Sequence, residues 1–263
     1  PKVMRLWDWS LPPAGVHREV LSIMPEGWHD QPRATRKPPI LFIHGLGHGA
    51  WCWREQWMPA AAERGFPVYA VSLRGHGDSG GRTKLGRTLL RHYVHDVLQT
   101  ITELPQQPVL VGHSMGALVS QLVADRYQPR GLALLTPAPI QGAAYTLPKL
   151  VRRRPAAAAK VLVGGTLPLG AEQLFTGLDD ATAARYVDRL GRESPWAQYE
   201  LLVPHRIGPV RCPVLVVGTP DDRVVDEAAV EETAAAYGVE PVWLPGIGHD
   251  LMLDAGWEKA LGV

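Results

Sequence analysis

The chain has 263 residues, a formal net charge of +1 and two cysteines, and hydrophobic residues make up 46% of it. This composition is too apolar for a disordered protein and too poor in cysteine for a disulfide scaffold, and the near-zero charge argues against a protein that binds nucleic acid or an anionic membrane. Because no stretch reaches the roughly 18 apolar residues of a membrane span and Pro1–Trp7 has no signal-peptide core, we expect a cytoplasmic protein.

Short apolar runs alternate with helical patterns along most of the chain. A β segment at Val20–Met24 and a proline-rich loop at His29–Pro39 come first. The apolar runs that follow are 40–43, 68–71, 109–111, 132–135, 214–217 and 242–244, and the helical patterns are 50–63, 89–103, a stretch from residue 115 onward, 226–238 and a last short helix. Strands that are apolar throughout are typical of a parallel sheet covered on both faces. The sequence therefore predicts an α/β fold with functional residues in the loops that follow the strands.

The segment from Pro137 to Arg211 breaks this alternation. It is rich in proline, has helix-like pieces at 155–163 and 181–190, and shows no clear strand pattern. We therefore expect a core domain formed by residues 1–136 and 212–263, with 137–211 inserted as a helical cap over the strand ends. The large apolar side chains of this cap are expected either to line a pocket or to form the core of the cap itself: Leu147, Leu150, Leu162, Leu167, Leu169, Leu174, Phe175 and Trp196.

A G-x-S-x-G motif at Gly112–Gly116 stands between an apolar strand and an amphipathic helix. A strand that turns sharply into a helix exposes the hydroxyl of the serine in the turn, and the flanking glycines let neighbouring chains pass closely. The free N–H groups at the start of the helix favour an oxyanion beside that serine. The motif therefore predicts Ser114 as a nucleophile.

A serine hydroxyl needs a base within hydrogen-bond reach, and the base needs a carboxylate that fixes its tautomer. His249 lies in a loop at a strand end, after the last apolar run, whereas His92 and His95 lie on a helix. Asp221 and Asp222 both follow the run 214–217. The chain order serine, aspartate, histidine is typical of a strand–turn–helix nucleophile, so His249 is predicted as the base and either aspartate as the acid.

Two backbone N–H groups are needed to hold an oxyanion beside Ser114. The N–H of Met115, the residue after the serine, is one candidate, and Leu46, in the loop after the strand at 40–43, supplies the other. We expect the substrate to contact Gly45 and His113 next to these donors, and Trp196 and Phe175 in the cap.

With these features the chain resembles the α/β-hydrolase superfamily over essentially its whole length. The resemblance is carried by 44–47, 74–79, 112–116, the Asp221-Asp222 turn and the Gly248-His249 pair. The segments His44–Trp53, which reads HGLGHGAWCW, and Gly248–Leu253 look like the branch that contains methylesterases and hydroxynitrile lyases. In related hydrolases the acid is often followed by a basic residue and a Val/Ile pair. The resemblance therefore favours Asp222 over Asp221.

The resemblance implies an α/β-hydrolase fold, with a mostly parallel central sheet, helices on both faces and an inserted helical cap. It also implies a serine carboxylic-ester hydrolase that acts on a small to medium hydrophobic or aromatic ester through an acyl-enzyme. A lactonase with the same triad is the alternative. A lyase is disfavoured because the hydroxynitrile lyases carry threonine where this chain has Gly45, and an intact triad argues against a non-catalytic ligand sensor.

The sequence gives no sign of a bound metal or cofactor. It contains neither the Gly-rich phosphate loop nor a His, Cys and Asp spacing that would suggest a metal site. We therefore expect a partner that is a small-molecule ester or lactone, with no metal and no cofactor, and a protein that is a monomer or a homodimer.

Overall fold

The computed structural model describes residues 15–263. The segment Pro1–Trp7, for which no signal-peptide core is expected, and the rest of the first 14 residues of the predicted core domain lie outside the described residues. The seven strands of its sheet are β1 (Val20–Ile23), β2 (Ile40–Ile43), β3 (Val68–Val71), β4 (Val109–His113), β5 (Gly131–Leu135), β6 (Val214–Gly218) and β7 (Val242–Trp243). Their order is β1-β3-β2-β4-β5-β6-β7, and the one antiparallel pair in this described sheet is β1 with β3. The sheet confirms the predicted α/β fold.

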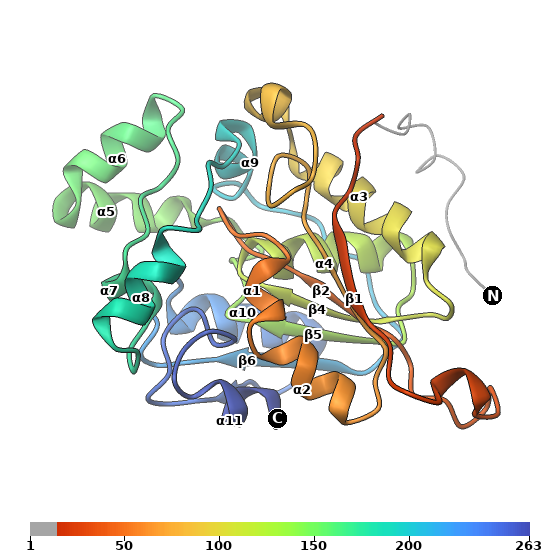
Figure 1. The fold of residues 1–263 in the computed structure, drawn as a ribbon. Coiled ribbons are helices and arrows are strands. Elements are labelled where there is room, and N and C mark those ends of the chain that lie inside the picture. The colour runs from red at the N-terminus through yellow and green to blue at the C-terminus, as the bar shows by residue number, and fades with distance from the viewer. Residues whose placement is uncertain (1–14) are drawn as a thin grey trace.

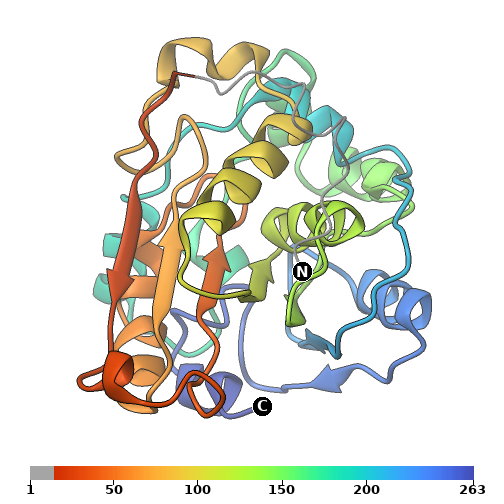
Figure 2. The same cartoon turned by 90° about the vertical axis from the view of Figure 1, so that its right-hand side faces the viewer.

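Helices cover both faces of this sheet (Figures 1 and 2). The longer helices and those nearest the sheet are α1 (Trp51–Arg54), α2 (Trp57–Glu63), α3 (Leu90–Glu103), α4 (Met115–Arg126), α10 (Glu227–Tyr237) and α11 (Trp257–Leu261). Residues of α3, α4 and α10 share one hydrophobic core, and residues of α1, α2 and α11 belong to another. In β2, Leu41 and Ile43 contribute to the first core and Phe42 to the second, because successive strand residues point to opposite faces.

The predicted single helix over 50–63 is wrong, because the structure has two short helices there. Gln56, between α1 and α2, has φ −134° and ψ −56°, which is outside the helical region. Pro59 explains the break, since its ring would clash with the carbonyl of residue 55 in a continuous helix. The two helices still pack on the sheet together, because the Trp53 ring stacks on Phe42 at 4.8 Å and lies 5.6 Å from the Trp57 ring.

The prediction for the helix at 226–238 is confirmed, and its ends show why it forms. The Asp226 side chain accepts a hydrogen bond from the Ala229 N–H at 3.2 Å, which caps the first turn of α10. Gly238 ends the helix with φ 65°, a left-handed conformation that glycine adopts without strain. The Asp222 turn lies just before this helix, so the cap at Asp226 also fixes where the turn ends.

The segment from Pro137 to Arg211 contains helices and, in the structure, no strand. The helices are α5 (Leu147–Arg153), α6 (Pro155–Leu162), α7 (Ala171–Leu174), α8 (Asp180–Val187) and α9 (Pro195–Glu200), preceded by a 3-10 turn at Ala143–Thr146. The pieces predicted at 155–163 and 181–190 correspond to α6 and α8, whereas α5, α7 and α9 were not predicted. In Figure 1 these helices lie to the left of and above the sheet, around the loops that follow its strands.

The other short elements are 3-10 turns at Trp28–Asp30 and Arg82–Arg87. Among residues 15–263, no helix combines the length and the hydropathy needed to cross a bilayer.

Candidate active site

Ser114 occupies the turn between β4 and α4 in a strained backbone conformation. Its φ is 54° and its ψ is −117°, and only one other non-glycine residue among those described, Thr136, has a positive φ. A Cβ on Gly116 would lie 2.3 Å from the Ile43 carbonyl oxygen, so that only glycine fits where α4 passes β2. Such strain persists where the surrounding structure holds it, and it is common at functional sites. The turn therefore presents the Ser114 side chain at the carboxyl end of the sheet, as the motif predicts.

His249 lies after β7 and is held by Asp222. The Nδ1 of His249 is 2.7 Å from Asp222 Oδ2, and each side chain is 2% exposed. The other Asp222 oxygen, Oδ1, accepts the N–H groups of Val224 and Val225 at 2.7 and 2.9 Å. Because a carboxylate only accepts, the His249 Nδ1 carries a proton and donates it, which leaves Nε2 of the neutral ring as a base.

Asp221, the alternative acid, is bonded elsewhere. The Asp221 Oδ2 accepts the Gly246 N–H at 2.6 Å, and Asp221 is exposed at the surface. The structure therefore brings Asp222, and not Asp221, to His249. Two adjacent residues in an irregular turn point in different directions, which the sequence alone does not reveal.

The environment of His249 changes its proton affinity. Burial lowers the pKa of His249, but the charge of Asp222 and its hydrogen bond raise it by more, so that the pKa lies above its ordinary value of 6.5. The Asp222 carboxylate thus stabilises the imidazolium form of His249. A histidine base needs this stabilisation, because it becomes an imidazolium when it accepts a proton during a reaction.

The loop after β2 lies directly against Ser114. A Cβ on Gly45 would be 3.1 Å from the Ser114 Cβ and 3.0 Å from the His113 Nδ1. Gly45 therefore packs against these two residues and does not line the cavity, contrary to the predicted substrate contact. The Gly45 carbonyl accepts from the His44 Nδ1 at 2.8 Å and from the His48 N–H at 3.2 Å. Because N–H and C=O point in opposite directions in a trans peptide, these two bonds fix the direction of the Leu46 N–H.

The two residues predicted to supply the oxyanion donors lie close to Ser114. Leu46 and Met115 line the same cavity as Ser114. Met115 is the first residue of α4, so its N–H has no acceptor within the helix. The Leu46 N–H likewise has no hydrogen-bond acceptor among residues 15–263.

His113 holds the His249 backbone. Its Nε2 donates to the His249 carbonyl at 2.9 Å, and burial, reinforced by the charge of His249, lowers the pKa of His113 to about 3. The ring is therefore neutral. His113 lines the cavity as expected, but its polar contact is with the protein rather than with open space.

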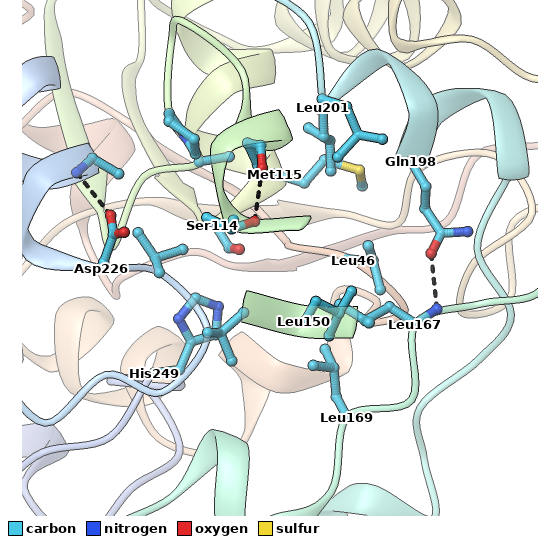
Figure 3. A pocket seen from close by; sticks show the side chains of 18 of the residues that line it. Leu46, Ser114, Met115, Leu150, Leu167, Leu169, Gln198, Leu201, Asp226 and His249 are labelled. Carbon is cyan, nitrogen blue, oxygen red and sulfur yellow. Dashed lines mark hydrogen bonds between the residues drawn. The ribbon is translucent and has the colours of Figure 1, made fainter. Parts of the chain in front are cut away.

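The cavity next to Ser114 and His249 has a volume of about 160 Å³ and a mostly apolar wall (Figure 3). Leu46, Leu150 and Leu169 lie to the right of these two polar side chains in this view. Further lining residues come from the loops after β5 and β6 and from the inserted segment: Ala138, Pro139, Leu147, Leu167, Gln198, Leu201, Val224 and Val225. An apolar cavity of about 150 Å³ is large enough for a benzene-sized molecule.

Trp196 and Phe175 do not line this cavity, and the sequence-based assignment of both is wrong. Trp196 is 54% exposed and packs edge-on against Tyr199. Phe175 is buried in the core beneath the His249 loop, 5.9 Å from the Tyr186 ring. The sequence shows that these side chains are apolar, but the direction in which each points depends on how the short helices of the segment pack.

Some lining residues could have been found from their positions. Ala138 and Pro139 follow β5, and Val224 and Val225 follow the Asp222 turn after β6, so they lie where a parallel sheet places its site. Gln198 had no such signal. Its side-chain oxygen accepts the Leu167 N–H at 2.8 Å, which joins two parts of the cavity wall.

One group of side chains in the described residues has the composition of a metal site. Potential ligand atoms of His113, His249 and Asp250 lie within 4.8 Å of one another. The chain's own hydrogen bonds already engage this group, since His113 binds a carbonyl, His249 binds Asp222, and Asp250 binds His48 at 2.8 Å. We assign no cation to it.

Residues 40–259 match the Alpha/beta hydrolase family. The chain is 34% identical to Methylesterase 3 of Arabidopsis thaliana over 94 residues, which is 35% of each protein. It is 31% identical to Probable esterase PIR7A of Oryza sativa subsp. indica over 122 residues, or 43% of this chain and 45% of that one. These matches thus span between about a third and a half of the curated relatives.

Solved structures match over nearly the full length at low identity. An esterase from Exiguobacterium antarcticum superimposes with a TM-score of 0.71 at 15% identity, and covers 94% of each chain. A monoacylglycerol lipase from Paleococcus ferrophilus has a TM-score of 0.66 at 20% identity, over 94% of this chain and 95% of that chain. These likenesses show the fold.

Proposed function

This chain belongs to the alpha/beta hydrolase family, and we propose that it is a serine hydrolase of carboxylic esters with Ser114, His249 and Asp222 as its triad. The observation that carries the proposal is the Asp222–His249 hydrogen bond of 2.7 Å at a cavity that also holds the strained Ser114. The likeness to proteins named methylesterase and esterase supports ester cleavage over other hydrolase reactions.

The proposed reaction proceeds through an acyl-enzyme. The His249 Nε2 takes the Ser114 hydroxyl proton while Oγ bonds to the ester carbonyl carbon. The carbonyl oxygen becomes an oxyanion, held by the N–H groups of Leu46 and Met115. When the C–O bond to the alcohol breaks, His249 gives its proton to the leaving oxygen. Water then attacks the acyl group with His249 as base, which releases the acid and restores the Ser114 hydroxyl.

The cavity supports a small, hydrophobic substrate. Its wall is largely leucine, valine, alanine and proline, and its volume of about 160 Å³ suits a group about the size of a benzene ring. The polar side chains in the wall besides Ser114 and His249 are His48, His113, Tyr145, Thr146, Gln198 and Asp226, and the protein's own hydrogen bonds engage each of them. We therefore propose that one side of the ester, acyl or alcohol, is a short aliphatic or single-ring aromatic group.

A substrate panel tests the function. One series of esters varies the acyl group with a fixed alcohol, a second varies the alcohol with a fixed acyl group, and a third contains lactones. We expect kcat/KM to fall by about tenfold or more once the group in the cavity exceeds a single ring, because overfilling a packed cavity costs roughly 1–3 kcal/mol.

The Ser114→Ala variant serves as the blank for spontaneous hydrolysis in this panel. A wild-type protein that hydrolyses no ester above this blank would contradict the proposal. A preference for lactones over all open esters would instead support the lactonase alternative, which uses the same triad.

The pH dependence follows from the proton affinity of His249. The neutral imidazole is the form that accepts the Ser114 proton, and the pKa of His249 is raised above 6.5. Activity is therefore expected to be full above the raised pKa and to decline as the pH falls through it, with an acid midpoint above about 6.5. The profile of kcat/KM against pH measures this midpoint. A profile that stays flat from about pH 5 to 8 would be incompatible with His249 as the base.

A further inference from the structure

Glu193 is a buried carboxylate in the inserted segment that contacts the oxyanion loop. Its side chain has no exposed surface, and its Oε2 accepts the Gly47 N–H at 3.1 Å and the His76 Nε2 at 2.9 Å. Its Oε1 accepts the Tyr93 hydroxyl and the Ser194 N–H. Four donors thus surround one carboxylate, and one of them belongs to the loop that carries Leu46.

The inserted segment holds Gly47 from both sides. The Gly191 N–H donates to the Gly47 carbonyl at 2.7 Å, while the Gly47 N–H donates to Glu193 two residues further along the segment. Gly47 has a φ of 72°, and a Cβ there would be 3.2 Å from the Gly191 carbonyl oxygen. Residues 191–193 therefore form a bracket, and only a residue without a side chain fits it well.

This bracket acts on the peptide next to the predicted oxyanion donor. The Leu46–Gly47 peptide is held at its N–H by Glu193 and at its carbonyl by the His48 Nδ1, 2.9 Å away. The preceding peptide, which carries the Leu46 N–H, is held at the Gly45 carbonyl. Leu46 thus lies between two fixed peptide planes. The core of the protein alone holds the Gly45–Leu46 peptide, whereas the Leu46–Gly47 peptide also needs Glu193 from the inserted segment.

His76 keeps Glu193 in place by charge. The His76 Nδ1 lies 3.1 Å from the Arg74 carbonyl, which can only accept, and its Nε2 faces the Glu193 carboxylate. Both ring nitrogens therefore carry protons, and the ring is a cation. Burial alone would lower the pKa of His76, but the charge of Glu193 together with the hydrogen bonds of the ring outweighs burial and raises the pKa. Burial would raise the pKa of the Glu193 carboxyl, but the charge of His76 together with the hydrogen bonds that the carboxylate accepts outweighs burial and lowers the pKa.

We propose that Glu193 is a positioning residue for the oxyanion site. Through Glu193, the segment 137–211 fixes Gly47 and thereby aligns the Leu46 N–H. This inference rests on the proposed function, since it assigns a role in the same reaction. Glu193 does not touch the reacting atoms. Its effect is expected in the stabilisation of the transition state rather than in substrate binding.

The variant Glu193→Gln tests this role. A glutamine has one acceptor oxygen, so its NH₂ group must face either the Gly47 N–H or the Ser194 N–H, and it no longer pairs with a charged His76. We expect kcat to fall by about 10- to 100-fold, less than the 10²–10³-fold typical of losing an oxyanion donor outright. The KM is expected to change by less than about threefold, and binding of a trifluoromethyl ketone, which forms a tetrahedral adduct with the serine, should weaken in parallel with kcat/KM.

Glu200→Gln is the matched control. Glu200 also lies in the inserted segment and also accepts a backbone N–H of the core, but that N–H belongs to Leu90, the first residue of α3, at 2.6 Å, and not to the oxyanion loop. Its loss should leave kcat within about twofold of the wild type. Equal losses of kcat in both variants would show a general structural effect and overturn the proposal, as would an unchanged kcat in Glu193→Gln.

A second variant covers the case in which Glu193→Gln does not fold. Glu193→Asp keeps the charge that His76 needs but withdraws the carboxylate from Gly47 by about one C–C bond, or ~1.5 Å. We expect a smaller loss of kcat in the same direction. Wild-type kcat in this variant would contradict the proposal.

NMR separates failure of this inference from failure of the proposed function. In the wild type the His76 ring should show two slowly exchanging N–H protons at neutral pH, and Glu193→Gln should remove at least one and shift the Gly47 amide signal. These signals do not depend on ester hydrolysis. A wild type that shows them but hydrolyses no ester would refute the function and not the bracket, whereas unchanged Gly47 and His76 signals in the variant would refute the bracket itself.

Discussion

Replacement of Ser114 by alanine is expected to lower kcat/KM for the best ester by on the order of 10⁴-fold or more, because no other group in the site would form the acyl-enzyme. The residual rate would come from the oxyanion donors and from substrate binding alone. The substitution should not unfold the protein. Ser114 is nearly buried and has a φ of 54°, and alanine, which also carries a Cβ, meets the same steric restriction there as serine. Steady-state kinetics and thermal unfolding of the purified variant measure both effects.

Ser120→Ala is the control for this prediction. Ser120 lies in the same helix, is fully buried, and donates to the Gly116 carbonyl at 2.7 Å. Its replacement should cost stability on the order of 1 kcal/mol through the lost hydrogen bond and leave activity close to the wild-type value. Near-wild-type activity in Ser114→Ala, with the rate of Ser120→Ala unchanged, would exclude Ser114 as the nucleophile.

The second large effect is expected at Asp222. In Asp222→Asn the amide oxygen can keep the N–H groups of Val224 and Val225, so the NH₂ group must turn toward the His249 Nδ1. Nδ1 would then accept a hydrogen bond rather than donate one, which places the ring proton on Nε2 and removes the base. We expect kcat to fall by about 10⁴-fold with the fold intact, the loss typical of this wrong tautomer.

Asp221→Asn gives the matched comparison one residue away. The Asp221 Oδ2 accepts the Gly246 N–H, and the amide oxygen of asparagine can do the same. This variant is therefore expected to retain kcat within about twofold. A large loss in Asp221→Asn with little loss in Asp222→Asn would reverse the assignment of the acid and contradict the geometry around His249.

The strands and the position of the serine turn could be predicted because local sequence determines them. The apolar runs of β2 to β6 are too continuous for a half-exposed strand, and Gly112 and Gly116 flank a serine between a strand and a helix. The chain order of Ser114, Asp222 and His249 then follows from the order of the strands in a parallel sheet. These features depend on residues close in sequence or on topology that few folds share.

Neither the choice of side chains from the inserted segment that face the pocket nor the bracket around Gly47 could be predicted, because both depend on packing between distant segments. Trp196 and Phe175 are as apolar as Leu150 or Leu169, and only the packing of α7 to α9 decides which of them face the cavity. Glu193 is one acidic residue among 26 acidic residues of the chain, and its partner Gly47 is 146 positions away. No periodicity or spacing in the sequence marks such a pair.

Labelling with a small fluorophosphonate tests the central claim most directly. The Ser114 Oγ would bond to phosphorus as the P–F bond breaks, with fluoride leaving and His249 taking the hydroxyl proton. We expect intact-mass spectrometry to show one adduct per chain, peptide mapping to place it on Ser114, and Ser114→Ala and Asp222→Asn to label not at all or far more slowly. An adduct on another residue, or a wild-type protein that stays unlabelled while it hydrolyses ester, would contradict the account.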